Sequence, residues 1–240
     1  MNKFFSSFFL DDKSKTIYDI FTHNNFDRHI RKSIPNFYKT QLLKINYLKT
    51  YNNYNILDIG GTTGALCKTI ALVSNNKTYN LDPNEEILFF NLLIPVINYQ
   101  YINKSFEDLE VNKYDVINET MTFQFINKNR SYHLLKVNTL LDQEGELFIE
   151  EKVKTRYFYI KELLNMIRKL IIFDPVTNIK KLKIIKEMNK NLVTEQYLSD
   201  IICSHWIYSV RYYKNLNFVG YYATNSKNKY NNFLNELNKL

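Results

Sequence analysis

From residue 54 onward, short apolar runs alternate with stretches of helical periodicity. The apolar runs fall at 54–59, 77–81, 98–103, 114–119 and 146–151, and the helical stretches between them lie near 63–74, 84–94 and 127–141. This alternation is typical of a parallel sheet whose strands are joined by crossover helices. We therefore predict an α/β fold with a doubly wound, mostly parallel sheet.

The segment before this region has a different pattern. Aromatic and aliphatic residues mix with charges over residues 14–34, Pro35 marks a break, and the apolar positions of 37–48 fit one face of a helix. We predict an N-terminal helical cap over residues 1–50, preceding a core over 51–152.

The C-terminal third is harder to interpret. Residues 153–192 are basic and have mostly helical periodicity, and we predict an inserted helical cap followed by a long helix near 194–214. Residues 217–223 predict a further strand, 225–232 a solvated turn, and 229–240 either a strand or a helix. We expect a single domain over 1–240, with the insertion at 153–215 and closing strands or a tail at 216–240.

Composition adds a charge asymmetry. Hydrophobic residues make up 45% of the 240 positions, enough apolar surface for one sizeable core. Residues 1–151 hold 16 Lys and Arg against 18 Asp and Glu, whereas residues 152–240 hold 16 against 6. The basic 152–240 segment therefore predicts either an anionic partner or a solvated face, and both interpretations stay open.

Cysteine and histidine usage indicates neither a disulfide framework nor a metal site. Cys67 and Cys203 both fall in predicted helices, and the four histidines are dispersed without metal-ligand spacing. No apolar run approaches the roughly 18 residues of a membrane span, and we interpret the apolar residues 1–10 as a capping segment. We expect a reducing, cytoplasmic setting with no membrane contact.

Glycine is scarce but concentrated. Three of the five glycines, Gly60, Gly61 and Gly64, follow the first strand of the predicted sheet, and Asp58 precedes them. Their spacing is neither that of the dinucleotide fingerprint nor that of a phosphate-binding P-loop. An Asp-x-Gly-x-x-x-Gly loop instead resembles motif I of the class I S-adenosylmethionine-dependent methyltransferases. The resemblance implies a seven-stranded, Rossmann-like sheet that binds S-adenosylmethionine.

The resemblance assigns further residues in chain order. Asp82, 24 residues after Asp58 and followed by Pro83, is placed to accept both ribose hydroxyls, although an Asp before Pro is also a common turn residue. Ser105 and Phe106 fall where the family holds adenine, and a loop with a buried Phe is the alternative. The expected cofactor-binding residues are Asp58, Gly60, Gly61, Thr62, Gly64, Asp82, Pro83, Ser105, Phe106 and Asn118, and Glu119 and Thr120 are the catalytic candidates.

A closer resemblance is to the carboxy-S-adenosylmethionine synthase family, which supplies a carboxymethyl donor for wobble-uridine modification of tRNA. The blocks that carry it are 26–37, the glycine loop, 122–126 and 147–152. The departures are Phe37 in place of a tyrosine, with Tyr38 adjacent, and Glu187 in place of the arginine that holds the extra carboxylate. Because an acid repels a carboxylate, carboxyl transfer is disfavoured unless Lys186, Lys190 or Arg211 substitutes. The substrate-pocket candidates are Phe37, Tyr38, Glu151 and Lys186.

Three functions follow from these observations. The first is methyl transfer from S-adenosylmethionine to an unidentified small-molecule or RNA acceptor. The second is carboxyl transfer to the donor, and the third is a non-catalytic module that binds nucleic acid or a protein. The aromatic residues Trp206, Tyr208, Tyr212 and Tyr213 are predicted to lie on one helix, in core or homodimer packing.

Overall fold

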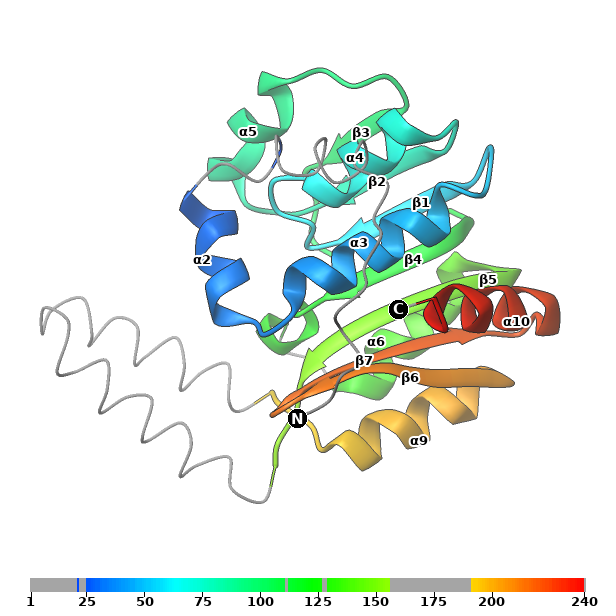
Figure 1. The fold of residues 1–240 in the computed structure, drawn as a ribbon. Coiled ribbons are helices and arrows are strands. Elements are labelled where there is room, and N and C mark those ends of the chain that lie inside the picture. The colour runs from blue at the N-terminus through cyan, green and yellow to red at the C-terminus, as the bar shows by residue number, and fades with distance from the viewer. Residues whose placement is uncertain (1–20, 22–24, 111, 127–128, 156–190, 240) are drawn as a thin grey trace, which may run out of the picture.

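The computed structural model describes Phe21 and residues 25–110, 112–126, 129–155 and 191–239 (Figure 1). Most of the predicted insertion after the fifth strand, including Lys186, Glu187 and Lys190, lies outside the described residues.

A seven-stranded sheet forms the centre, in the order β3-β2-β1-β4-β5-β7-β6 (Figure 1). Strands β1 to β5 are parallel where they pair, and β7 runs antiparallel to both β5 and β6. The doubly wound, mostly parallel prediction is therefore confirmed, and the strand order reverses between β1 and β4, where such sheets bind ligands. The strands are β1 (Asn55–Ile59), β2 (Lys77–Leu81), β3 (Tyr99–Ile102), β4 (Tyr114–Thr120), β5 (Leu141–Lys152), β6 (Tyr208–Asn215) and β7 (Phe218–Thr224).

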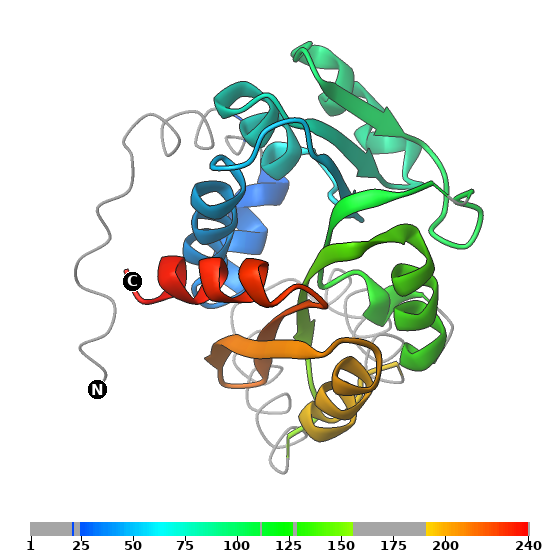
Figure 2. The same cartoon turned by 90° about the vertical axis from the view of Figure 1, so that its right-hand side faces the viewer.

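Helices cover both faces of the sheet (Figure 2). On one face α3 packs against both α4 and α10, and on the other α6 packs against α9. The helices are α2 (Asn25–Ser33), α3 (Phe37–Leu48), α4 (Ala65–Val73), α5 (Leu88–Leu93), α6 (Arg130–Leu140), α9 (Glu195–His205) and α10 (Lys227–Leu237), with 3-10 turns η2 (Glu85–Ile87) and η3 (Phe123–Phe125).

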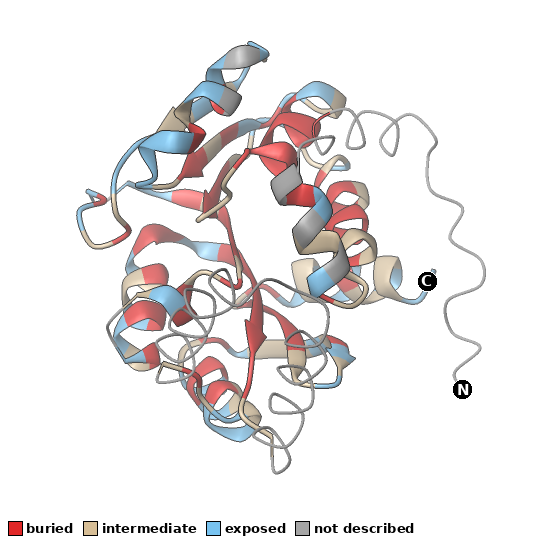
Figure 3. Cartoon of the chain, turned by 90° about the vertical axis from the view of Figure 1, so that its left-hand side faces the viewer, coloured by how far each residue is buried: buried red, intermediate tan, exposed pale blue. Residues whose placement is uncertain are grey.

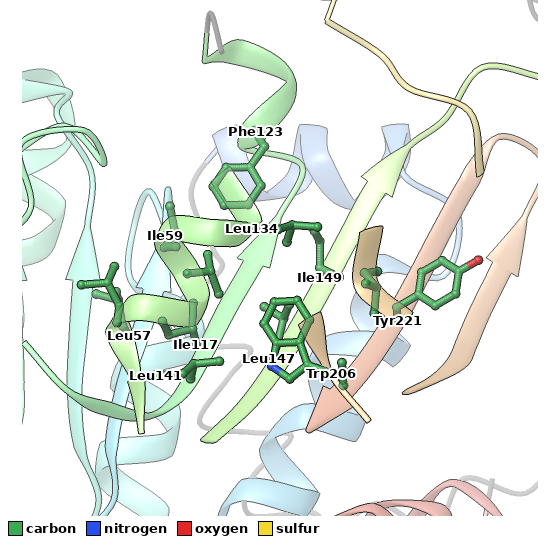
Figure 4. Packing of buried hydrophobic residues seen from close by; sticks show 14 of the residues in the cluster. Leu57, Ile59, Ile117, Phe123, Leu134, Leu141, Leu147, Ile149, Trp206 and Tyr221 are labelled. Carbon is green, nitrogen blue, oxygen red and sulfur yellow. The ribbon is translucent and has the colours of Figure 1, made fainter. Parts of the chain in front are cut away.

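The apolar residues form one core on each side of the sheet, so that the buried positions follow the strands (Figure 3). Successive residues of β5 serve opposite cores, because side chains alternate along a strand. Leu147 and Ile149 pack with Leu134 of α6 and with Trp206 at the end of α9 (Figure 4). Phe148 packs in the second core with residues of α3 and α10.

Two C-terminal predictions are wrong. The long helix expected at 194–214 ends at His205, and Tyr208, Tyr212 and Tyr213 lie on strand β6 instead. Residues 225–232, expected as a solvated turn, are helical from Lys227 onward as the first part of α10, although half of them are exposed. Of the two structures left open for 229–240, the structure has a helix through Leu237. Trp206 and Tyr213 are buried in the fold, so core packing accounts for both.

Candidate active site

A cavity of about 540 Å³ opens at the carboxyl edge of β1, β2 and β4. Its walls come from the glycine loop after β1, from the loops after β2 and β3, from the turn after β4, and from helices α2 and α3. The cavity therefore lies at the position where a doubly wound sheet binds its ligand.

The glycine loop needs residues without a side chain at specific points. Gly60 and Gly64 have φ of 69° and 71°, a region that glycine occupies without steric cost. A Cβ on Gly61 would overlap the carboxylate of Asp58 and the amide of Asn80. Gly60 lines the cavity, whereas Gly64, outside the lining, forms the N-cap of α4.

Two residues of the cavity wall have strained backbones. Thr62 has φ of 49° and Met121 has φ of 59°, left-handed values that are uncommon for residues other than glycine. Both line the cavity. Such strain concentrates at functional sites.

Asp58 faces the cavity from the end of β1. It lies opposite Asn118 in the register of β1 and β4, and Asn118 Nδ2 donates to Asp58 Oδ1 at 2.6 Å. Burial raises the pKa of Asp58 to about 6, and the bond from Asn118 works in the opposite direction. Asp58 therefore changes charge close to neutral pH, within the cavity wall.

Asp82 and Pro83 line the same cavity from the end of β2. Asp82 Oδ1 accepts the backbone N–H of Asn84 at 3.0 Å, which fixes the orientation of the carboxylate. Burial raises the pKa of Asp82 above its ordinary value. Asp82 is a turn residue and a cavity residue at once, so the two interpretations of its position are compatible.

Ser105 and Phe106 line the cavity beyond β3. Ser105 Oγ donates to Asp108 Oδ2 at 2.7 Å, a contact that orders the loop. Phe106 is buried and packs against Phe123, with ring centroids 5.3 Å apart. Phe106 thus belongs to the core and to the cavity wall together.

The two catalytic candidates occupy different environments. Glu119 does not line the cavity: its Oε1 accepts the N–H groups of Thr122 and Phe123 at 2.5 and 3.0 Å, and so holds the turn after β4. Burial, and next the charge of Glu151, raise the pKa of Glu119 well above its ordinary value. Thr120 does line the cavity, and its Oγ1 accepts a hydrogen bond from Lys44 Nζ at 3.0 Å.

The substrate-pocket candidates are brought together only in part. Phe37 lines the cavity, whereas Tyr38 lies outside the lining with the guanidinium of Arg31 4.4 Å from its ring centre. Glu151 does not line the cavity. It is buried on the face of β5 that packs against α6, where its carboxylate accepts a hydrogen bond from Arg130 at 2.9 Å. Lys186 lies outside the described residues.

The sequence reasoning missed residues of α2 and α3 that complete the wall. Asp27 of α2 accepts from Thr63 Oγ1 at 3.0 Å, which ties that helix to the glycine loop. Asp27 belongs to the 26–37 block, whose resemblance was the one signal for it. Further wall residues outside the expected set include Ile30, Ile34 and Gln41 from this region, and Met121, Phe125 and Ile126 from the turn after β4.

In the described part of the basic C-terminal segment, two cations of β6 share one acid. Arg211 and Lys214 of β6 both pair with Glu195, at 2.5 and 2.7 Å. Arg211 therefore faces away from the cavity lining, and it does not act as a carboxylate anchor there.

The described residues contain neither a metal-binding cluster nor a membrane-spanning helix. No group of three or more His, Cys, Asp or Glu residues in these parts of the chain could hold a metal ion. Within the same parts, no helix has the length and apolarity that crossing a membrane requires.

The fold of this chain is similar to that of several solved structures. No family model and no curated protein matches the sequence. A S-adenosylmethionine-dependent methyltransferase from Aquifex aeolicus is similar with a TM-score of 0.52 and 14% identity, over 78% of this chain and 89% of that one. The YcgJ protein of Bacillus subtilis is similar with a TM-score of 0.53 and 14% identity, over 72% of each chain.

Other similar structures are matched over a smaller share of the two chains. A putative S-adenosylmethionine-dependent methyltransferase from Listeria monocytogenes, with a TM-score of 0.43 and 18% identity, is matched over 48% of this chain and 55% of that one. At such identities the likeness establishes the fold alone. This chain has the Rossmann-like α/β fold of S-adenosylmethionine-dependent methyltransferases.

Proposed function

We propose that this chain is a methyltransferase that uses S-adenosylmethionine. The observation that carries the proposal is the convergence of Asp58, the glycine loop, Asp82 and Phe106 on one cavity at the switch point of the sheet. These are the residue types that an adenosine with an amino-acid tail requires.

The charge of the wall supports a cationic ligand. Among the described residues that line the cavity, the charged ones are all acidic: Asp27, Asp58, Asp82 and Glu107. S-adenosylmethionine carries a positive sulfonium, so this potential favours it. A carboxylated donor would add a negative charge, and we therefore propose methyl rather than carboxyl transfer.

Four wall residues have proposed roles in holding the cofactor. Asp82 accepts the ribose hydroxyls, Phe106 packs against the adenine, and the backbone of Gly60 and Gly61 approaches the methionine part closely. When bound, S-adenosylmethionine supplies a methyl group already activated by the sulfonium. The chain is then required to position the acceptor in line and to exclude water, without a strong base.

The acceptor is a small molecule or an RNA, and transfer to tRNA is the narrower version of the proposal. The interpretation as a non-catalytic module is the competing one. The two differ in what Asp82 does, because a surface that binds nucleic acid through basic residues does not depend on this carboxylate.

Isothermal titration calorimetry of the full chain tests the proposal. We expect S-adenosylmethionine and S-adenosylhomocysteine to bind, and Asp82→Ala to weaken both by about tenfold or more, as loss of a charged hydrogen-bond partner predicts. Asp142→Ala is the matched control, because Asp142 is exposed at the opposite edge of the sheet. Failure of both ligands to bind at millimolar concentration would overturn the proposal.

A further inference from the structure

Helix α3 defines which part of the cavity receives the acceptor, an inference that rests on the proposed function. Along α3, Tyr47 donates to Glu146 in the first half of the paired part of β5, and Lys44 pairs with Glu150 near its end. The helix thus runs antiparallel to β5. Toward its N-terminus, Gln41, one turn beyond Lys44, and Phe37, about two turns beyond it, line the cavity.

This part of the cavity, the acceptor half, is bounded by Ile34, Phe37, Gln41, Thr120, Met121 and Phe125. Four of these six side chains are apolar. An apolar wall of this kind suits a small molecule with an apolar body. Its chemical selectivity therefore depends on the two polar members, Gln41 and Thr120.

The hydroxyl of Thr120 can act only as a donor toward a ligand. Its oxygen accepts from Lys44 Nζ at 3.0 Å and from Asn118 Nδ2 at 3.4 Å, which occupies both lone pairs. No described residue accepts the hydroxyl proton of Thr120. The proton is consequently available to an acceptor atom in the cavity, and the neighbouring ammonium of Lys44 strengthens it as a donor.

Gln41 offers a second donor. Its side chain is 3% exposed, and its Nε2 has no hydrogen-bond partner among the described residues. A buried amide N–H without a partner carries a free-energy penalty, and a ligand oxygen that accepts a hydrogen bond from it would remove that penalty.

The groups that accept hydrogen bonds lie in the other half of the cavity. Asn118 Oδ1 is buried and has no partner in the described parts of the chain, and its residue lies beside Asp58 in the register of β1 and β4. The Asp27 carboxylate is held at the glycine loop by Thr63. Groups that accept hydrogen bonds thus face the proposed methyl donor, whereas groups that donate hydrogen bonds face the proposed methyl acceptor.

We propose that the acceptor half binds a small apolar molecule that carries an acidic oxygen, as a carboxylate or a phenolate, and that this oxygen receives the methyl group. Thr120 and Gln41 donate hydrogen bonds to the oxygen-bearing group and orient it. A lone pair on the oxygen forms the new O–CH₃ bond while the C–S bond breaks, and the electrons of that bond remain on sulfur. Because the oxygen enters as an anion, no proton has to be removed, which agrees with an acceptor half that contains no base.

Fragments that differ in their polar group test this inference. The full chain, saturated with S-adenosylhomocysteine, is titrated with benzoate, 4-nitrophenolate and benzylamine, and binding is followed by ligand-observed NMR. We expect both oxygen anions to bind more tightly than benzylamine, because the four acids of the wall lie outside the acceptor half and the ammonium of Lys44 lies beside Thr120. Gln41→Leu and Thr120→Val should each weaken benzoate binding by about fivefold to tenfold, the effect of one lost hydrogen bond.

Two further variants separate recognition from folding. Thr120→Ser keeps the hydroxyl and should retain benzoate binding, while Gln196→Leu, on the exposed surface of α9, should leave it unchanged. Affinity for S-adenosylhomocysteine should stay within about twofold in all four variants, because neither Gln41 nor Thr120 has a proposed role in holding it.

The outcomes distinguish the two proposals. If S-adenosylhomocysteine binds but benzylamine binds as well as benzoate, or if the variants bind benzoate normally, this inference is overturned and the cofactor proposal stands. Methyl transfer to bulk tRNA with none to carboxylate or phenolate compounds would also overturn it. If benzoate binds with the expected selectivity and S-adenosylhomocysteine does not, the cofactor proposal fails instead.

Discussion

Two glutamates on the same face of β5 are buried beneath α3, four residues apart, and their surroundings differ. Glu146 Oε2 accepts from the phenols of Tyr47 and Tyr222, both at 2.6 Å, and Lys229 Nζ lies 3.7 Å from Oε1. Glu150 Oε1 accepts from Tyr212 at 2.6 Å and pairs with Lys44 at 3.0 Å. The second oxygen of each glutamate, Oε1 of Glu146 and Oε2 of Glu150, has no hydrogen-bond partner among the described residues.

The difference follows the distance from the cavity. The Glu146 network is made mainly of phenols and does not reach the cavity lining, so its role is to satisfy a buried charge. The Glu150 network continues through Lys44 and Thr120 to the cavity wall. Each network thus leaves one carboxylate oxygen without a hydrogen bond, and the two differ in where they lead: only the Glu150 network reaches the wall of the proposed binding site.

The largest effect on stability is expected at Lys44. Lys44→Met would leave Glu150 buried without its cation, at a cost of about 3–5 kcal/mol in the free energy of unfolding. Urea denaturation followed by circular dichroism measures this. The double variant Lys44→Met with Glu150→Gln should recover most of the loss, and a single-variant loss below about 1 kcal/mol would show that the pair is not the stabilising element.

A smaller loss is expected in the Glu146 network. Tyr222→Phe removes one of two phenol donors to a buried carboxylate, and we expect a loss of about 1.5–3 kcal/mol with unchanged affinity for S-adenosylhomocysteine. Tyr197→Phe, at an exposed phenol of α9, is the control and should change stability little. Any change in ligand affinity in Tyr222→Phe would contradict the separation of the two networks.

The smallest effect concerns pH. Asp58, linked to the Glu150 network through Asn118 and Thr120, has a pKa of about 6, so it is neutral below that pH and anionic above it. A cationic ligand favours the anion, and its affinity should therefore rise by about tenfold from pH 5 to pH 7, a shift of one pKa unit. Calorimetry at several pH values checks this, with S-adenosylhomocysteine, which lacks the sulfonium, as the matched ligand.

A variant sharpens the same measurement. Asp58→Asn can still accept from Asn118 but does not titrate, so the rise in affinity for S-adenosylmethionine should disappear. An unchanged pH profile in this variant would assign the titration to another group.

The central strands could be predicted because they are buried on both faces, and such strands appear in sequence as continuous apolar runs. Strand β6 could not. It is an edge strand with mostly half-buried residues. The connection between α9 and β6 contains no Gly or Pro, so no residue there indicates that the helix ends. The turn into β7 places Leu216 at φ of 55°, so the usual glycine signal is missing there.

The glycine loop could be found because spacing specifies it. Gln41 and Lys44 could not, because α3 is covered so completely that Thr40 through Ile45 are all buried. On such a helix, periodicity does not distinguish a polar residue that faces a cavity from one that faces solvent. The assignment of Glu119 could have been refined from strand parity, since Asn118 and Thr120 share the face that Glu119 does not.

The place of β7 in the sheet also has a consequence for synthesis of the chain. Strand β7 lies between β5 and β6, yet it is the last of the three to leave the ribosome. Until Phe218–Thr224 has been made, β5 has one open edge and β6 has no neighbour to pair with. The half of the sheet that carries Glu146 and Glu150 is therefore completed only after translation of that segment, while the half built from β1 to β4 can assemble earlier.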